Sequence, residues 1–138
     1  MKRKVRILIA DDDSMLRRIF ASMCSSLSGM ELVGVAEDGE QALEQCKTLA
    51  PDVVLLDINM PKLSGIETLK RIKELAPDTC VVMLTAMSSV ETVRECIAAG
   101  AHSYILKSNQ TDEIRATIKN ICFEQLKKIV GSPAAKKG

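Results

Sequence analysis

Five apolar runs alternate with five helical patterns along this chain, and that alternation limits its possible folds more than any other feature. The runs are short, continuous and aliphatic, which is typical of strands buried on both faces. Each run is followed by apolar residues at the spacing of a helix with one buried face. Strict alternation with short connections implies right-handed crossovers, so the sequence predicts an α/β fold with helices on both faces of a five-stranded parallel sheet. The predicted strands are Val5–Ala10, Leu32–Ala36, Val53–Leu56, Cys80–Leu84 and Ser103–Leu106.

Glycine and proline residues give the expected limits of the first three helices. Apolar residues at helical spacing run from Leu16 to Leu27, and Gly29 is expected to stop that helix. The second helical pattern ends before Pro51 and the third before Pro77, because proline disfavours a helical conformation in the residue that precedes it. The next apolar run follows each break within a few residues, so we expect short connections.

The last two helices have different limits. Ser88 with Glu91 forms a capping-box pattern at the start of the fourth helix, and Gly100 is its expected C-terminal cap. The final helical pattern runs from about Thr111 to Val130, roughly 30 Å at 1.5 Å per residue, and its C-terminal part is expected to extend beyond the sheet. The segment 131–138 has the composition of a flexible linker. We therefore expect one domain over residues 1–130 and a flexible tail over residues 131–138.

Composition argues against several functional classes. The chain has 138 residues, near the usual size of one domain, with 46% hydrophobic residues and a formal net charge of +1. That balance gives no basis for direct nucleic-acid binding, and no apolar run approaches the roughly 20 residues of a membrane span. The five cysteines include no CxxC pair, which indicates reduced thiols that act as small hydrophobic residues. No secretory signal is recognisable, so we expect a cytoplasmic protein.

Acidic, hydroxyl and basic residues follow the predicted strands at the points where the strands end. Asp11–Asp13 follow the first strand, Asp57 the third, Thr85 the fourth and Lys107 the fifth. In an open α/β sheet these carboxyl ends share one edge, where ligands bind in the crevice at which the helices switch face. We therefore expect the acidic groups of the first and third strands to lie together at that crevice.

These residue types suit phosphoryl chemistry. Two carboxylates 4 Å apart repel by about 4 kcal/mol at an effective dielectric constant near 20, and a hard divalent cation such as Mg²⁺ offsets that repulsion. The Asp57 carboxylate is a candidate nucleophile that forms an acyl phosphate. The Lys107 ammonium and the Thr85 hydroxyl are suited to holding phosphoryl oxygens as charge develops during transfer.

The order and spacing of these groups make the sequence resemble the receiver domains of response regulators, and among them the stand-alone chemotaxis type. The resemblance covers about residues 4–126, and four separate segments in the same order make it specific. It implies a flavodoxin-like (βα)5 fold with strand order 2-1-3-4-5. The matching segments are ILIADDD (7–13), VVLLDINMPKLSG (53–65), VVMLTA (81–86) and AGAHSYILK (99–107).

The resemblance also implies a metal and a phosphoryl donor. By this resemblance Asp57 accepts a phosphoryl group from the phosphohistidine of a histidine kinase. Asp12 is implied as a direct Mg²⁺ ligand, together with Asp57 and the main-chain carbonyl of Asn59. Asp11 is implied to act on the metal mainly through water.

A switch is implied in the same way. Thr85 and Lys107 are expected to hold the phosphoryl group, and Tyr104 to change rotamer when Thr85 moves. Plain edge-strand packing is the alternative interpretation of Tyr104. The surface of the fourth helix, fifth strand and last helix is then expected to bind a target. Asn59 and Met87 are expected to flank the phosphoryl site and to influence how fast water removes the phosphate.

Two positions depart from the family pattern or remain open. Ser108 follows Lys107 where the family usually has proline, often with a cis peptide bond. A cis bond before serine would cost about 3–4 kcal/mol, so we expect a different loop geometry there while Lys107 keeps its role. Asp13 is either a further acidic group of the site or the cap of the first helix with Ser14.

The predicted function is a phosphorylation-dependent signalling switch and not a turnover enzyme. We expect the protein to be a monomer or a weak dimer linked to phosphorylation. We expect no direct contact with nucleic acid and no insertion into a membrane. One alternative is that the chain is the receiver piece of a larger regulator, for example a DNA-binding one. Another is an aspartate-nucleophile phosphohydrolase, although its usual second acid is replaced here by Asn59. A flavin or nucleotide carrier and an adaptor that no longer uses phosphate are weaker alternatives, because the phosphoryl-handling set is intact and a P-loop is absent.

Overall fold

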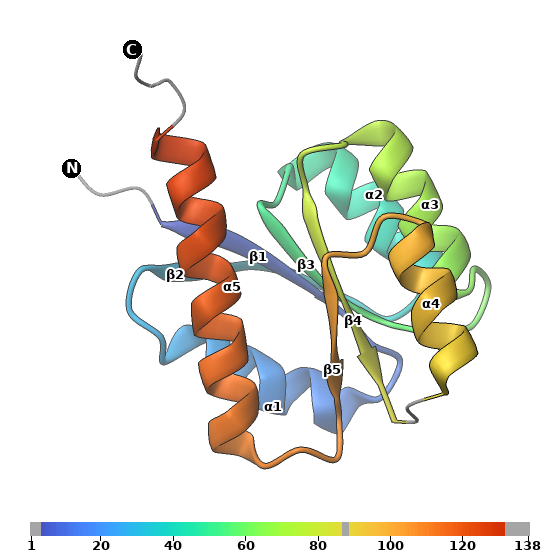
Figure 1. Cartoon of the computed structure of the whole chain (residues 1–138), viewed down its shortest axis with the longest axis horizontal. Helices are drawn as coiled ribbons and strands as arrows, with labels where there is room; N and C mark the ends of the chain where they lie inside the picture. The colour runs from blue at the N-terminus through green and yellow to red at the C-terminus, as the bar shows by residue number, and fades with distance from the viewer. Residues whose placement is uncertain (1–3, 87–88, 132–138) are drawn as a thin grey trace.

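The computed structural model describes residues 4–86 and 89–131, which form one five-stranded parallel sheet with the order β2-β1-β3-β4-β5 (Figure 1). The predicted fold class and strand order are confirmed. The strands are β1 (Val5–Ala10), β2 (Met30–Ala36), β3 (Val53–Asp57), β4 (Cys80–Thr85) and β5 (Ser103–Leu106). The helices are α1 (Ser14–Ser25), α2 (Gly39–Leu49), α3 (Gly65–Leu75), α4 (Val90–Ala98) and α5 (Thr111–Gly131).

Each face of the sheet has its own apolar core, because successive side chains of a strand point to opposite faces. Ile7 and Ile9 of β1 pack with α1 and α5, while Leu8 between them packs with α2, α3 and α4. Figure 1 shows the same division, with α1 and α5 on one side of the sheet and the other three helices on the opposite side. The central strands β3 and β4 are buried along their whole length, as their continuous apolar runs predict.

Several predicted limits shift by one to a few residues. β2 begins at Met30 and not at Leu32, while β3 and β4 continue one residue further than predicted and so include Asp57 and Thr85. α1 ends at Ser25 instead of continuing to Leu27. The main-chain N–H of Ser26 bonds carbonyls of the last turn of α1 and its hydroxyl donates to one of them, which closes the helix early.

Capping explains both ends of α4. The predicted cap Ser88 lies outside the described residues, and the cap that the structure describes is Ser89, whose Oγ accepts from the N–H of Thr92. At the other end, Gly100 has φ +112 and donates to the carbonyl of Ile97. The next N–H, of Ala101, bonds the carbonyl of Cys96, which completes a Schellman motif and confirms the predicted glycine cap.

The structure changes the expected end of α5 and supports the interpretation of the cysteines. Gly131, predicted as the first tail residue, is the last residue of α5, and residues 132–138 lie outside the described residues. All five cysteines are free and buried, and burial raises the pKa of the thiols of Cys24 and Cys122 to about 12. Among the described helices none is both long and apolar enough to cross a bilayer.

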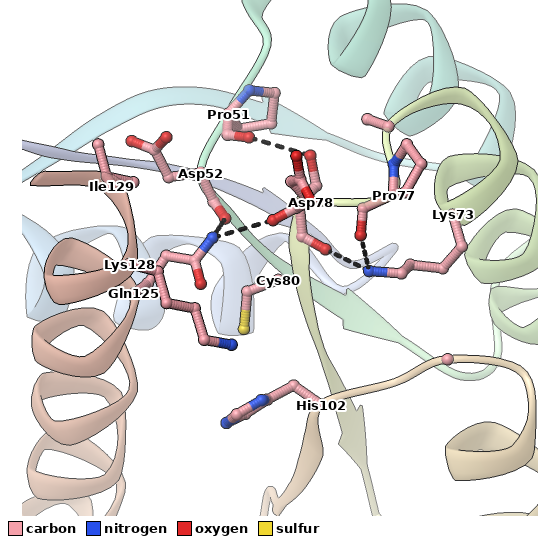
Figure 2. Close-up of a pocket in the computed structure, with 13 residues that line it drawn as sticks. Pro51, Asp52, Lys73, Pro77, Asp78, Cys80, His102, Gln125, Lys128 and Ile129 are labelled. Carbon is pink, nitrogen blue, oxygen red and sulfur yellow. Dashed lines mark hydrogen bonds between the residues drawn. The ribbon is translucent and has the colours of Figure 1, made fainter. Parts of the chain in front are cut away.

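A cavity of about 710 Å³ opens at the amino ends of β3, β4 and β5, at the edge of the sheet opposite Asp57 (Figure 2). At its wall, the Gln125 side chain of α5 donates through Nε2 to the carbonyls of Asp52, at 3.2 Å, and Asp78, at 3.1 Å. Two loops are thereby tied to the last helix. Lys73, near the end of α3, holds the loop that contains Asp78 as well, because its Nζ donates to the carbonyls of Pro77 and Thr79 at 2.7 Å.

The Gln125 contacts give a first testable prediction. Gln125→Met keeps the length of this buried side chain but removes the amide that donates to two carbonyls, of which that of Asp52 keeps its bond from the N–H of Cys80, so we expect the free energy of unfolding to fall by about 1–2 kcal/mol. Urea titration followed by circular dichroism measures this. The control is Asn120→Leu, an exposed amide on the same helix, which is expected to stay within about 0.5 kcal/mol of the parent. Equal destabilisation of the two variants would contradict this role for Gln125.

Candidate functional site

The strand register brings the predicted residues to one edge of the sheet. Ala10, the last residue of β1, pairs with Leu56 of β3, so that Asp11 and Asp57 leave neighbouring strands at the same level. Thr85 ends β4 beside Leu106 of β5. Because parallel strands have their carboxyl ends on one side, residues far apart in sequence meet there.

At this edge of the sheet, Lys107 lies between two of the acidic side chains. Its Nζ lies 2.9 Å from Asp11 Oδ2 and 3.1 Å from Asp57 Oδ1, and only 13% of its side chain is exposed. The lysine is held in place by its main chain, whose N–H donates to the carbonyl of Thr85 at 2.8 Å. One partly buried ammonium therefore bridges acids from two strands as a compact positive charge.

The three consecutive aspartates have separate environments. Asp11 is fully buried, and its Oδ1 accepts from the N–H of Asp13 at 2.9 Å. Asp13 caps α1, because its carboxylate accepts from the N–H groups of Met15 and Leu16, so the capping interpretation of Asp13 holds. Asp12 is exposed, and within the described residues no hydrogen bond or ion pair to its carboxylate is found.

Burial and neighbouring charges determine the pKa values of Asp57 and Lys107. Burial, and then the negative charge of Asp11, raise the pKa of Asp57 to about 6, although the ammonium of Lys107 and the N–H of Asn59 act in the opposite direction. For Lys107, burial acts to lower the pKa. The hydrogen bond to Asp11 and the charge and hydrogen bond of Asp57 outweigh burial, so the pKa of Lys107 is raised and the ammonium stays charged.

Carboxylate oxygens of Asp11, Asp12 and Asp57 all lie within 4.8 Å of one another. Hard oxygen donors at that spacing, with one carboxylate exposed and lacking a described partner, fit a hard divalent cation. Asn59 follows Asp57 closely, and its N–H donates to Asp57 Oδ1 at 3.4 Å. The donor set is therefore compatible with Mg²⁺, and a bound cation would neutralise the excess negative charge of the three carboxylates.

The remaining predicted residues lie around this cluster or beyond it. Thr85 is buried at the end of β4, while Tyr104 is 41% exposed on β5, where it pairs with Met83. Met87 lies outside the described residues. Cis peptide bonds are absent from the described parts of the chain, which include the Lys107–Ser108 bond, so the loop there differs from the usual cis geometry as expected.

Sequence reasoning missed two supports of the site. Arg17 of α1 donates through Nη1 to the main-chain carbonyl of Asp11 at 2.7 Å. Gly65 begins α3 so close to Asp57 that an added Cβ would lie 2.2 Å from the carbonyl oxygen of Asp57. The SG pair before the third helical pattern was a usable signal for the glycine, whereas nothing in the sequence indicates the contact that Arg17 makes.

The family model described as "Response regulator receiver domain" matches residues 7–119. The chain belongs to the response regulator receiver domain family. This receiver domain is 38% identical over 113 residues to the chemotaxis protein CheY of Bacillus subtilis, covering 82% of this chain and 93% of CheY. The resemblance inferred from the four sequence segments is thereby confirmed.

Other relatives of the receiver domain are longer. The uncharacterized transcriptional regulatory protein YxjL of Bacillus subtilis is 37% identical over 118 residues, 86% of this chain and 54% of YxjL. A protein-glutamate methylesterase/protein-glutamine glutaminase of Halalkalibacterium halodurans is 34% identical over 137 residues, 99% of this chain and 39% of the relative. The chain thus spans about half of the first of these relatives and less of the second.

Solved structures agree with the fold. The response regulator domain of Thermotoga maritima CheB superposes with a TM-score of 0.81 at 30% identity, covering 90% of this chain and 97% of that domain. A CheX-CheY-BeF3-Mg+2 complex from Borrelia burgdorferi gives a TM-score of 0.77 at 27% identity, with 94% and 92% coverage. Receiver domains are the phosphoacceptor signalling domains of two-component systems and not turnover enzymes, and they typically bind Mg²⁺ at an acidic pocket of this kind.

Proposed function

We propose that this receiver domain is a phosphorylation-dependent switch in which Asp57 accepts a phosphoryl group from the phosphohistidine of a histidine kinase. The observation that carries the proposal is the partly buried Lys107 ammonium held between Asp11 and Asp57, beside a third carboxylate of Asp12. A structural ion pair needs only one acid. Three clustered carboxylates, of which two contact the lysine, leave an excess of negative charge that is unfavourable unless a bound cation neutralises it or one of the acids reacts.

The proposed transfer is a direct displacement at phosphorus. A carboxylate oxygen of Asp57 forms a bond to phosphorus while the phosphorus–nitrogen bond of the phosphohistidine breaks, and the imidazole nitrogen keeps the electron pair. The product is an acyl phosphate on Asp57. Lys107 stays protonated and keeps a positive charge next to the reacting carboxylate, where it is suited to hold a phosphoryl oxygen. The hydroxyl of Thr85 is proposed as a second holding group from the neighbouring strand.

Asp12, Asp57 and the main-chain carbonyl of Asn59 are proposed to hold Mg²⁺ directly, with Asp11 acting through water. When bound, the ion supplies positive charge that offsets carboxylate repulsion and the charge of the transferring group. Asp12 fits the role of ligand because its carboxylate is exposed and has no described partner. Asp11 is less available, since its Oδ1 accepts from the N–H of Asp13 and its Oδ2 forms the ion pair with Lys107.

The output is proposed to be the surface of α4, β5 and α5. Exposed apolar side chains on this surface support binding of a protein target, namely Val90 at 64%, Ile97 at 46% and Tyr104 at 41%. Phosphorylation is proposed to draw in Thr85, after which Tyr104 moves into the space that Thr85 leaves. The Tyr104 side chain is outside the core in the described structure, so an inward position would change the surface.

We further propose a single receiver domain over residues 1–130, now extended by Gly131 of α5, followed by a flexible tail. The domain is proposed to be a cytoplasmic monomer or weak dimer without direct nucleic-acid contact. Coverage of nearly all of CheY supports a stand-alone switch. Partial coverage of YxjL and of the methylesterase supports the second candidate, the receiver piece of a larger regulator.

The test uses acetyl phosphate as a small phosphoryl donor. Incubation with Mg²⁺ is expected to add the mass of one phosphoryl group to the intact protein, and excess EDTA is expected to prevent it. Asp57→Asn should show no addition, while Asp78→Asn, an exposed acid at the opposite edge, should behave as the parent. Equal addition to the parent and to Asp57→Asn, or none to the parent, refutes the assignment. Continuous release of phosphate from a phosphate monoester, which is not an activated donor like acetyl phosphate, would favour the phosphohydrolase alternative.

A further inference from the structure

The loop between β3 and α3, residues 58–64, is closed at its base. The N–H of Gly65 donates to the carbonyl of Ile58 at 2.8 Å, so the two ends of the loop meet. An added Cβ on Gly65 would lie 2.2 Å from the carbonyl oxygen of Asp57. Within the loop, the N–H of Leu63 bonds the carbonyl of Pro61 at 2.7 Å. The loop therefore leaves the phosphoacceptor, makes one tight turn and returns against it, and Asn59 lies on the outgoing arm.

The returning arm of this loop rests on the first residue of α2. A Cβ added to Gly39 would lie 2.3 Å from the carbonyl oxygen of Leu63 and 2.4 Å from Oγ1 of Thr68. Thr68 is itself fixed, because its hydroxyl donates to the carbonyl of Ser64 at 2.7 Å. Any side chain at position 39 must therefore displace the main chain of the loop, since the nearest obstacle is a backbone atom and not a flexible side chain.

An ion pair joins the same two segments. Lys62 has φ +68, a left-handed conformation that a lysine rarely adopts, and its Nζ lies 3.7 Å from Oδ2 of Asp38. Asp38 is buried and already caps α2 by accepting from the N–H of Gln41 at 2.8 Å. A strained loop residue that reaches a buried acid on another element indicates a loop whose shape is determined by that element.

We propose that Gly39 and the Asp38–Lys62 ion pair are positioning residues of the phosphoacceptor loop, and that the start of α2 thereby sets the Mg²⁺ affinity of the site. The contacts form a continuous path. Gly39 packs against the main chain of Leu63, the N–H of Leu63 bonds the carbonyl of Pro61, and Pro61 follows the arm that carries Asn59. The inference rests on the proposed function, because it assigns a role to residues that support the metal and phosphoryl site without touching either.

The main test is Gly39→Ala, with Mg²⁺ alone as the probe. The Mg²⁺ midpoint, which is the concentration that half-saturates the site in isothermal titration calorimetry, is expected to rise about tenfold, the usual effect of disturbing residues that orient metal ligands. The rate of mass gain with acetyl phosphate at a fixed, subsaturating Mg²⁺ concentration is expected to fall in proportion. A structural role alone would lower the melting temperature in EDTA and leave the Mg²⁺ midpoint unchanged.

Gly29→Ala provides a control for loss of stability. Gly29 has φ +84 and open space around it, and it lies next to the amino end of β1, far from the acidic edge. The substitution should strain the backbone and lower the melting temperature in EDTA, with the Mg²⁺ midpoint of the parent. An equal midpoint in Gly39→Ala and the parent overturns the proposal.

Lys62→Met tests the proposal without adding a side chain against the loop. If Gly39→Ala does not fold, Lys62→Met alone tests the positioning role. Removing a positive charge near an acidic site would by itself strengthen Mg²⁺ binding, so a weaker affinity can come only from a displaced loop. We expect a two- to threefold higher midpoint, since 61% of the Lys62 side chain is exposed and such pairs are weak. Lys62→Arg should restore the parent midpoint, and Lys70→Met, which removes an exposed charge from α3, should not raise it.

The outcomes separate this inference from the function on which it rests. If the parent neither binds Mg²⁺ nor gains mass from acetyl phosphate, the proposed function fails and the positioning role fails with it. If the parent does both and Lys62→Met has an unchanged or lower midpoint, the proposed function stands and the positioning role of the ion pair is refuted.

Discussion

Lys107→Met is expected to lower the free energy of unfolding by about 3 kcal/mol at pH 7.5. The reason is that Asp11 and Asp57, which are 0% and 5% exposed, lose the ammonium that they share at 2.9 and 3.1 Å. Removing one partner of a buried ion pair leaves uncompensated charge, which costs several kcal/mol, whereas methionine preserves most of the side-chain volume. Urea unfolding in EDTA measures the loss.

The loss should depend on pH and on metal. As the pH falls, the Asp57 carboxylate becomes neutral and the penalty shrinks, and this begins above the parent pKa of about 6 because Lys107 no longer lowers the pKa of Asp57. Saturating Mg²⁺ should restore part of the lost stability, because a cation takes over the neutralisation. Lys128→Met, an exposed lysine near the end of α5, is expected to change stability by less than about 0.5 kcal/mol. A loss that is independent of pH would show that the penalty is not electrostatic.

Asp57→Asn is expected to abolish acyl phosphate formation and, in metal-free buffer at pH 8, to stabilise the fold by up to about 3 kcal/mol. Burial and the neighbouring Asp11 raise the pKa of Asp57 from 3.8 to about 6, and one pKa unit corresponds to about 1.4 kcal/mol. Asparagine has the same shape without the charge. Lys107 keeps its ion pair with Asp11 in this variant, so the substitution leaves no cation unpaired.

The sign of the pH dependence follows from the raised pKa. The folded state binds the Asp57 proton more tightly than the unfolded state, so the contribution of this group is most favourable below pH 3.8 and is lost as the pH rises to about 6. The gain in Asp57→Asn should therefore be largest above pH 6 and vanish near pH 4. Urea titrations at pH 4 and pH 8 test this, with Asp78→Asn as the exposed control. A constant gain at both pH values would exclude the charge of Asp57 as its cause.

The sequence was sufficient to predict the five strands and five helices of an α/β fold because those signals are local, whereas the strand order followed only from the resemblance to receiver domains. Continuous apolar runs identified β3 and β4, which are buried along their entire length. Gly100 identified the end of α4 through the φ that only glycine readily adopts. Errors occurred where a single side chain closes a helix, as Ser26 does for α1, since such short-range competition does not alter hydrophobic spacing.

The candidate site was predictable in identity but not in detail. Residue types at the strand ends were enough to select Asp57 and Lys107, because parallel strands must bring their carboxyl ends together. The sequence could not show that Asp11 is buried against Lys107 while Asp12, its neighbour, is exposed. Adjacent residues in a turn point in different directions, and only the packing around them determines which of them meets solvent.

The sequence by itself determined the order of the elements, the sheet that they form and the chemical groups at its edge, since periodicity and turn residues act within a few positions of the chain. Only the tertiary structure decided which acids share a lysine, that burial raises the pKa of Asp57, and that Gly39 supports a loop two elements away. Those properties depend on distances and desolvation between segments remote in sequence, and both are set when the chain packs.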